Sequence, residues 1–230
     1  MELSRMIDHT LLKPEATEAD IRRLVAEAAE HRFATVCVNG RWVRLAAELL
    51  QAAGAAHGEK GVKVCAVAGF PLGAMKSTVK AMEAIAAVKD GAREIDMVAS
   101  LGLLLEGKVE EVRAEIFEVT RAARTANREM VVKVILETAA LNEEQTALGC
   151  RAAREGGADF VKTSTGFHSK GGATLETVHW LVKYAEGLKV KAAGGIRDRA
   201  AAEAMIAAGA TRLGTSNGVA ILMGKSGVGY

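Results

Sequence analysis

The sequence has few cysteines, and those present form no recognisable pattern. Cys37, Cys65 and Cys150 are odd in number, widely separated and outside any CxxC or His-rich spacing. This usage excludes a disulfide framework and gives no indication of a zinc site. We therefore expect reduced thiols and a cytoplasmic location.

Long apolar runs and an excess of charge of one sign are also missing. No uncharged stretch is long enough to cross a bilayer, and residues 1–9 contain no apolar run typical of a signal peptide. The 30 Lys and Arg residues nearly balance the 28 Asp and Glu residues, and aromatic residues make up only 4% of the chain. A nucleic-acid-binding surface normally has a basic stripe and stacking aromatics. We therefore expect neither a membrane nor a nucleic acid as a partner.

The chain does have the size and composition of one globular domain. It contains 230 residues, of which half are apolar and a quarter are charged. Short β-type runs alternate with longer helical runs from end to end, which is typical of a parallel sheet with helical crossovers. The predicted strands are residues 7–10, 35–38, 63–67, 94–98, 131–137, 159–163, 190–193 and 212–215.

Caps and glycines mark the helix boundaries. Thr17 can cap a helix whose Asp20 stands at the capping-box position, and Asn142 and Asp198 are further N-caps. A helix that ends at glycine and is followed by a short link into a strand recurs at Gly91, Gly157 and Gly209.

These repeated units predict an α/β protein that forms a single-domain (β/α)8 TIM barrel over residues 1–230. Residues 219–230 are expected to be a flexible C-terminal tail. A doubly wound open sheet is the alternative fold. However, no strand is followed by a GxGxxG turn, and eight units favour closure into a barrel.

Lysines interrupt three predicted strands, namely at Lys133, Lys162 and Lys191. Parallel strands are normally almost continuous apolar runs, and a buried ammonium group is costly. Alternation along the strand places Lys162 inside the barrel near its C-terminal mouth. A partly desolvated lysine beside another cation, for which Lys191 is the candidate, can supply the neutral amine that attacks a carbonyl. Each lysine could instead pair with a barrel carboxylate, but three together favour a catalytic function.

Acidic residues also occupy predicted strands. Asp96 lies in an otherwise apolar strand, where it can exchange a proton with Lys191 or simply neutralise a lysine, and the sequence leaves both interpretations open. On the first strand, Asp8 is an accessory candidate that faces the pocket. His9 is more typical of a hydrogen-bonded structural histidine.

Two glycine-rich loops follow the seventh and eighth predicted strands. The first contains Gly194, Gly195 and Arg197, and the second contains Gly214 and Ser216. In barrels these two loops often bind phosphate through backbone N–H groups and a helix N-terminus. Tight turns would explain one glycine pair, whereas two such loops favour a phosphorylated substrate.

Five segments occur in an order that resembles the deoxyribose-phosphate aldolase family. They are IDHTLLKP at 7–14, GFPLG at 69–73, EIDMV at 94–98, DFVKTSTG at 159–166 and KAAGGIR at 191–197. The resemblance extends from Asp8 to Tyr230. It implies a class I aldolase that reversibly cleaves 2-deoxy-D-ribose 5-phosphate to acetaldehyde and D-glyceraldehyde 3-phosphate, without a metal or other cofactor.

Carried over residue by residue, the resemblance implies that Lys162 forms the Schiff base and that Asp96 relays protons. Lys191 is implied to tune the nucleophile and join the relay. The 5-phosphate is implied to bind at Gly166, Gly194, Gly195, Gly214 and Ser216. A protonated imine is the electron sink that cleavage requires, so no cofactor is expected.

Tyr230 ends the chain, and some members of the family likewise end in a tyrosine thought to help protonate the enamine. A terminal residue after a glycine-rich stretch is otherwise a mobile tail. Three positions depart from the family pattern. Gly40 replaces a common proline, Asn217 replaces a common second serine, and Phe167 stands where some members have lysine. The last two changes weaken the expected phosphate contacts.

Two other functions remain open. One is another Schiff-base aldolase or a transaldolase with a different donor. The other is a barrel that binds a sugar phosphate without turnover, which would leave the buried lysines unexplained. The expected partners are small sugar phosphates and aldehydes, together with further copies of the chain in a homo-oligomer, with a dimer favoured.

Overall fold

A computed structural model of the chain describes residues 2–56 and 61–227. Eight parallel strands pair with their neighbours in chain order, and the last strand pairs with the first, so that the sheet is a closed barrel. The strands are β1 Ile7–Leu11, β2 Thr35–Val38, β3 Lys63–Ala68, β4 Glu94–Val98, β5 Val131–Ile135, β6 Phe160–Lys162, β7 Lys189–Ala193 and β8 Arg212–Thr215.

The closed sheet confirms the predicted TIM barrel. Every predicted strand is present, with ends that shift by at most a few residues. The pairing of β8 with β1, through Ile7 with Leu213 and Asp8 with Gly214, excludes the open doubly wound sheet. A single parallel barrel of this kind needs a helix after each strand to cover its outer face.

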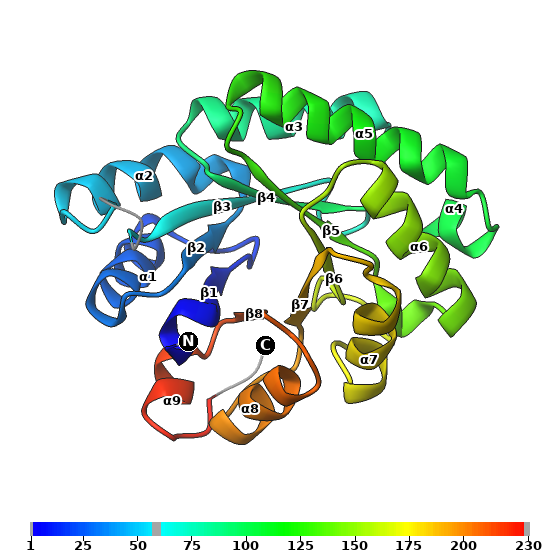
Figure 1. The fold of residues 1–230 in the computed structure, drawn as a ribbon. Helices are drawn as coiled ribbons and strands as arrows, with labels where there is room; N and C mark the ends of the chain where they lie inside the picture. The colour runs from blue at the N-terminus through cyan, green and yellow to red at the C-terminus, as the bar shows by residue number, and fades with distance from the viewer. Residues whose placement is uncertain (1, 57–60, 228–230) are drawn as a thin grey trace.

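Helices surround the barrel as an outer ring, as Figure 1 shows. The strands turn alternate residues outward, and apolar side chains such as Val132, Val134 and Val161 join the core between sheet and helices. The helices are α1 Glu18–His31, α2 Val43–Ala52, α3 Ser77–Lys89, α4 Leu101–Leu105, α5 Val109–Ala126, α6 Glu143–Glu155, α7 Leu175–Tyr184, α8 Arg199–Ala207 and α9 Gly218–Leu222.

The predicted helix caps are present. The Thr17 side chain accepts from the backbone N of Asp20, whose carboxylate accepts from the backbone N of Thr17. Asn142 forms the same reciprocal box with Gln145, and Asp198 Oδ1 accepts from the backbone N of Ala201 at 2.8 Å. These side chains satisfy N–H groups that the first helical turn leaves unpaired.

The predicted glycine links are also present, and they contain close contacts. The φ angles of Gly91, Gly157 and Gly209 are positive, at 112°, 81° and 108°. A Cβ atom at Gly209 would lie 2.7 Å from Val182 Cγ2, so glycine is needed there for the packing as well as for the backbone angle.

The prediction of a flexible tail over residues 219–230 is wrong for the first residues of that range. Residues 219–222 belong to α9, the helix of the eighth βα unit, and Ile221 is buried in the core. The apolar Ile221 side chain anchors this short helix, so at least this part of the segment is ordered. Tyr230 lies outside the described residues.

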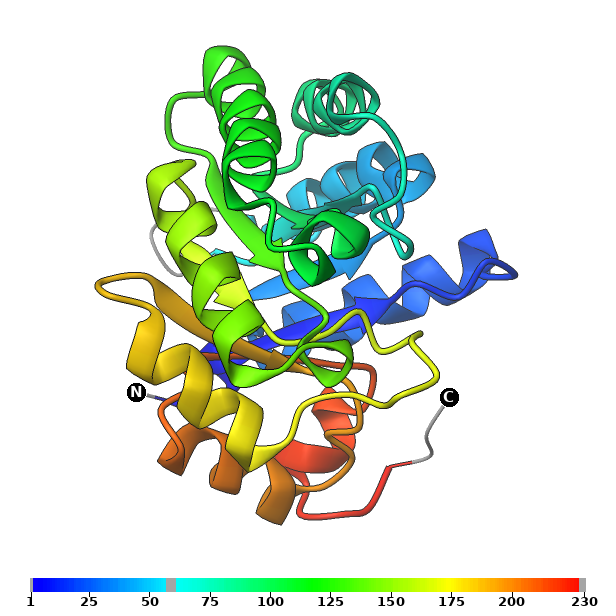
Figure 2. The same cartoon turned by 90° about the vertical axis from the view of Figure 1, so that its right-hand side faces the viewer.

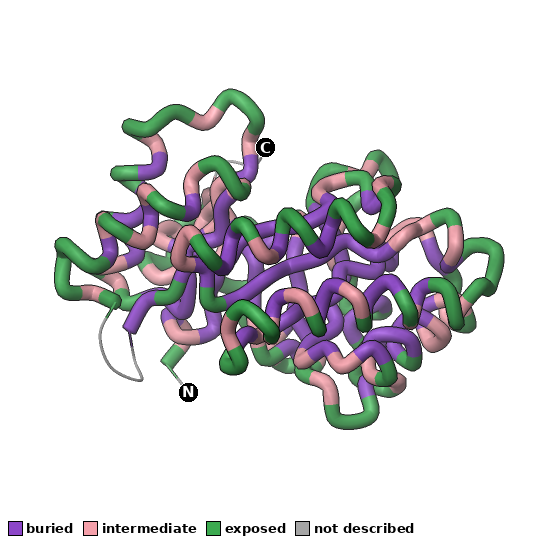
Figure 3. The backbone as a smooth tube through the Cα atoms, turned by 90° about the horizontal axis from the view of Figure 1, so that it is seen from above, coloured by how far each residue is buried: buried purple, intermediate pink, exposed green. Residues whose placement is uncertain are grey.

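Burial is concentrated in the strands and in the inward faces of the helices, as Figure 3 shows. Within the described part of the chain, no helix combines the length and the apolar character needed to cross a membrane. Figure 2 shows the long connection between β6 and α7, drawn in yellow, at the right-hand edge of the barrel.

Candidate active site

A cluster of charged side chains fills the barrel interior, with Asp96 of β4 at its centre. Asp96 Oδ2 lies 2.8 Å from Lys162 Nζ and 2.7 Å from Lys191 Nζ. Its other oxygen, Oδ1, lies 2.8 Å from Lys133 Nζ. The strand register produces this meeting, because Asp96 pairs with Lys133 and Lys162 pairs with Lys191. One carboxylate therefore contacts all three lysines that interrupt the predicted strands.

A second layer of charges lies beneath these contacts. Lys191 Nζ also donates to Asp8 Oδ2, and Arg212 Nη1 donates to Asp8 Oδ1 at 2.6 Å. Glu94 Oε2 lies 3.0 Å from the same Arg212 nitrogen and 2.6 Å from Lys133 Nζ. The interior cluster is thus formed by Asp8, Glu94, Asp96, Lys133, Lys162, Lys191 and Arg212.

The neighbouring charges outweigh burial in setting the ionisation of this cluster. Burial alone would raise the pKa of Asp96, but Lys133, Lys162 and Lys191 hold that pKa well below its ordinary value. Burial alone would lower the pKa of Lys191, but the carboxylates of Asp8 and Asp96 raise it. These neighbouring charges therefore favour the charged forms of both Asp96 and Lys191.

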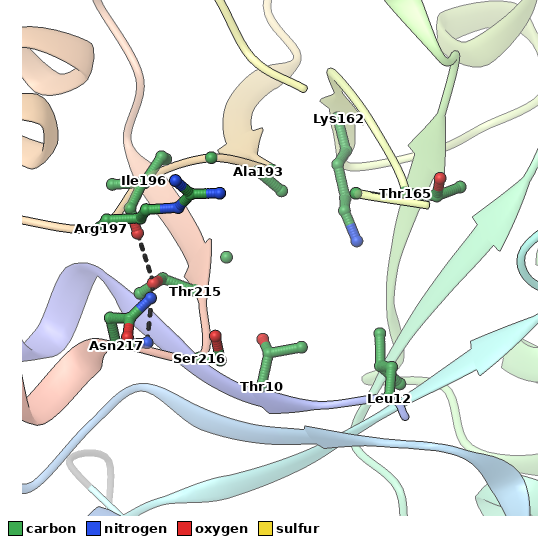
Figure 4. A pocket seen from close by; sticks show the side chains of 14 residues that line it. Thr10, Leu12, Lys162, Thr165, Ala193, Ile196, Arg197, Thr215, Ser216 and Asn217 are labelled. Atoms are coloured by element: carbon green, nitrogen blue, oxygen red, sulfur yellow. Dashed lines mark hydrogen bonds between the residues drawn. The ribbon is translucent and has the colours of Figure 1, made fainter. Parts of the chain in front are cut away.

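Lys162 is the member of the interior cluster that lines a pocket at the barrel mouth. Its side chain is only 3% exposed. Figure 4 shows it extending from β6 toward an open space that Thr10 and Ser216 border on the other side. An amine at this position is buried on one side and accessible to a ligand on the other.

The five residues predicted to bind phosphate line the same pocket as Lys162, namely Gly166, Gly194, Gly195, Gly214 and Ser216. Gly166, Gly194 and Gly195 have φ angles of 84°, 89° and 82°, a left-handed backbone conformation that residues other than glycine rarely adopt. Arg197 also lines this pocket. The structure thus brings the predicted nucleophile and the predicted phosphate loops together.

Hydrogen bonds hold the loops of the pocket against one another. Thr215 Oγ1 donates to the carbonyl oxygen of Ile196 at 2.7 Å and accepts from the backbone N of Asn217 at 3.0 Å, as Figure 4 shows. A Cβ atom at Gly172 would lie 2.4 Å from the carbonyl oxygen of Gly194. The connection after β6 therefore packs backbone to backbone on the loop after β7.

Of the two candidates on the first strand, Asp8 has surroundings that differ from those expected, whereas His9 does not. Asp8 is fully buried and contacts Lys191 and Arg212, but it does not line the pocket. Asp8 is therefore connected to the pocket only indirectly, through Lys191 and Asp96 to Lys162. His9 Nε2 lies 2.7 Å from Glu27 Oε2 on α1, as expected of a structural histidine.

Sequence reasoning missed other residues of the site. Thr10 and Thr165 line the pocket, and Arg212 and Glu94 complete the charge cluster. Arg212 and Glu94 stand in predicted strands, so the signal that singled out the lysines could have singled them out as well. Thr10 and Thr165 carry no such signal, because threonine is common in strands and loops.

Potential metal ligands lie close together in the barrel interior. The Sγ atoms of Cys37 and Cys65 and a carboxylate oxygen of Asp96 lie within 4.8 Å of one another. Both Asp96 oxygens, however, already accept from ammonium groups. Three neighbouring positive charges oppose a further cation there, so this cluster does not fit a metal centre.

Comparison with known proteins agrees with the class that the fold and the site define, a barrel enzyme with a buried lysine at its mouth. Residues 4–224 match the model of the family described as DeoC/LacD family aldolase. The chain belongs to this family of aldolases, which are lyases.

Individual relatives cover nearly the whole chain. It is 52% identical to the deoxyribose-phosphate aldolase of Bdellovibrio bacteriovorus, over 98% of each chain, and 49% identical to that of Enterococcus faecalis, over all of each chain. Among solved structures, an aldolase named QR15 has 42% identity and a TM-score of 0.87, with coverage of 97% of this chain and 95% of that one. The deoxyribose phosphate aldolase of Aeropyrum pernix, described as tetrameric, has 37% identity, coverage of 96% and 89%, and a TM-score of 0.87.

The Arg212 ion pairs generate a prediction about stability. Replacing Arg212 with Met leaves two buried carboxylates with fewer partners and should lower the free energy of unfolding by about 3–5 kcal/mol. Urea denaturation at pH 7 measures this change. The control is Arg199→Met, which breaks an exposed pair with Glu203 and should change stability by about 0.5 kcal/mol or less. Equal losses in the two variants would contradict the importance of the buried pairs.

The same variant should change the response to acid. Burial raises the pKa of Asp8, but the positive charges of Arg212 and Lys191 together lower it by more. The folded-state pKa therefore lies well below the ordinary value. Such a carboxyl stabilises the fold fully above its unfolded pKa of about 3.9, and the stabilisation is lost as pH falls toward the folded-state pKa. Arg212→Met should therefore lose less stability than the wild type between pH 5 and pH 2, relative to its own value at pH 7.

Proposed function

We propose that this protein reversibly cleaves 2-deoxy-D-ribose 5-phosphate to acetaldehyde and D-glyceraldehyde 3-phosphate through a Schiff base on Lys162. The observation that carries the proposal is the position of Lys162 Nζ, 2.8 Å from Asp96 and on the wall of a pocket whose other walls are glycine-rich loops. Relatives with about half of their residues identical carry the name deoxyribose-phosphate aldolase, which supports this substrate.

The proposed chemistry needs Lys162 as a neutral amine. The interior cluster holds four basic and three acidic side chains. Loss of one proton from Lys162 would leave equal numbers of positive and negative charges in this largely buried cluster, where an unbalanced charge is costly. The neutral Nζ then attacks C1 of the open-chain sugar, and loss of water gives the iminium ion.

The iminium ion makes cleavage of the C2–C3 bond feasible. The electrons of that bond move into the iminium group as the C3 hydroxyl loses its proton, which releases glyceraldehyde 3-phosphate and leaves an enamine on Lys162. Protonation at C2 and hydrolysis then release acetaldehyde and restore the amine. The protein supplies the electron sink and the proton transfers.

Asp96 and Lys191 are the residues that we propose for those proton transfers. Asp96 Oδ2 contacts both Lys162 Nζ and Lys191 Nζ, so a proton that leaves the nucleophile has a direct acceptor with a second donor beside it. Asp8 holds the far side of Lys191 and thereby positions it. Lys133 contacts the other oxygen of Asp96 and orients the carboxylate.

The phosphate end of the substrate would occupy the glycine-rich part of the pocket. We assign its binding to the backbone N–H groups of Gly166, Gly194, Gly195 and Gly214 and to the hydroxyl of Ser216. Support comes from the positive φ angles of three of these glycines and from the basic Arg197 in the same wall. Such backbone groups bind phosphate without a dedicated cationic side chain for each oxygen.

Trapping with borohydride tests the nucleophile. Incubation with 2-deoxy-D-ribose 5-phosphate and borohydride should leave a reduced adduct on the peptide that contains Lys162, as read by mass spectrometry. Lys162→Ala should lose the adduct and roughly 10⁴-fold or more of the turnover. The control is Lys170→Ala, which changes an exposed lysine in the connection between β6 and α7. An adduct that persists in Lys162→Ala would refute the proposal.

The released products decide between the open alternatives. Acetaldehyde formation from the phosphorylated sugar supports the proposed reaction. An adduct without acetaldehyde indicates another Schiff-base aldolase or a transaldolase. Substrate binding with no adduct indicates a barrel that binds a sugar phosphate without turnover.

Replacing Lys191 with Leu tests the proton relay. The rate should fall by about 10²-fold or more, because the relay loses the group beside Asp96. Exchange of acetaldehyde C2 hydrogens with deuterium oxide should slow in parallel, while the borohydride adduct still forms. The control is Lys63→Leu, an exposed lysine at the start of β3. Unchanged exchange with reduced turnover would argue that Lys191 has only a structural role.

We also propose a homo-oligomer in the cytoplasm, with a dimer as the favoured form. Support for assembly comes from exposed apolar side chains, among them Leu72, Met82 and Phe117, and from the tetramer described for the Aeropyrum pernix relative. Support for the location comes from three buried cysteines without a disulfide. Analytical ultracentrifugation should give a mass of at least twice 24.1 kDa, and a monomer at micromolar concentration would refute assembly.

A further inference from the structure

Glu137 is a buried acidic residue that the proposed chemistry does not use. It follows β5 and begins the connection to α6, and only 4% of it is exposed. Its backbone is left-handed, with φ 61° and ψ 55°, a conformation that is uncommon for a residue with a long side chain. Such conformations persist where surrounding contacts determine them, and they cluster at functional sites.

The side chain of Glu137 accepts its hydrogen bonds from Thr165. Glu137 Oε1 lies 3.1 Å from the backbone N of Thr165, and Oε2 lies 2.5 Å from its hydroxyl oxygen. That hydroxyl oxygen in turn accepts from the backbone N of Phe167 at 3.1 Å. One carboxylate therefore fixes the backbone on both sides of Gly166.

The segment fixed in this way belongs to the pocket wall. Thr165 and Gly166 both line the pocket, and Gly166 has a φ angle of 84°. A Cβ atom at Gly166 would lie 3.7 Å from Gly194 Cα, so the two glycines lie side by side. Any shift of Thr165 would therefore move a proposed phosphate contact.

Lys162 is held independently of Glu137. It is paired with Ile135 of β5 and Lys191 of β7, and its carbonyl oxygen accepts from the backbone N of Leu136 at 3.0 Å. These strand-pairing contacts hold Lys162 at a position before residues 165–167, the segment that Glu137 holds through Thr165. Loss of the Glu137 contacts should therefore disturb the phosphate end of the pocket more than the nucleophile.

We propose that Glu137 is a positioning residue for phosphate recognition, acting through Thr165 to orient the backbone N–H of Gly166. This inference rests on the function proposed above and concerns only how the enzyme selects a phosphorylated sugar. The role depends on the reach of the carboxylate rather than on its charge.

Two matched variants separate reach from charge. Glu137→Asp keeps the charge and tolerates a left-handed backbone, but it is one carbon too short to reach Thr165 in the same way. Glu137→Gln keeps the length and an acceptor oxygen but loses the charge. The kcat and KM values are measured for 2-deoxy-D-ribose 5-phosphate and for unphosphorylated 2-deoxy-D-ribose, with Glu144→Asp on the exposed face of α6 as the control.

The expected readout is the ratio of kcat/KM for the phosphorylated sugar to that for the unphosphorylated one. Glu137→Asp should lower this ratio about tenfold, mainly through KM of the phosphorylated sugar, as expected for lost hydrogen bonds to a charged group. Glu137→Gln should lower it less. Thr165→Val should resemble Glu137→Asp, and the double variant should add little, because both changes remove the same contact.

Three results would overturn the inference. They are an unchanged ratio in both Glu137→Asp and Thr165→Val, a larger effect in Glu137→Gln than in Glu137→Asp, and equal losses on both substrates. If Glu137→Asp fails to fold in a thermal melt, Thr165→Val carries the test. Borohydride trapping of acetaldehyde on the wild-type protein keeps the two proposals apart. Absence of an adduct on Lys162 refutes the proposed function, whereas an adduct with an unchanged ratio refutes only the role of Glu137.

Discussion

The contact of one carboxylate with three lysines is the interaction on which the site depends. Asp96 is fully buried, and its two oxygens accept from Lys133, Lys162 and Lys191. Without it, three ammonium groups would face one another in a region of low dielectric, at a cost far above that of an ordinary surface charge. The barrel tolerates a lysine nucleophile in its interior because this anion is placed among the cations, and the same placement gives the nucleophile a proton acceptor.

Most of the fold could be predicted from the sequence because its signals are local. Short apolar runs between helical stretches identified all eight strands, and the side chains of Thr17 and Asn142 marked helix starts that the structure contains. The last helix was missed because five residues near the chain end carry too little pattern to distinguish a short helix from a tail. Its buried apolar side chain, Ile221, becomes significant only when β8 is next to β1.

The candidate site was predicted less completely, because its remaining parts depend on distant contacts. Lys162, Lys191 and Asp96 stood out as charges in apolar strands, and the structure brings them together. Arg212 and Glu94 could have been noticed for the same reason, but their partners follow only from closure of the barrel. Neither a left-handed glutamate nor its hydrogen bond to Thr165 can be read from residue type, since both arise where two loops meet.

Closure of the barrel has a consequence for how the protein is made. Of the eight barrel strands, β1 leaves the ribosome first and β8 last, and Asp8 of β1 is bound by Arg212 of β8. During synthesis the early strands can pair and cover themselves with helices, but Asp8 lacks Arg212 until β8 has emerged. A nascent chain that lacks β8 would therefore expose or neutralise this carboxylate, so the interior of the barrel reaches its final charge pattern only after β8 has been made.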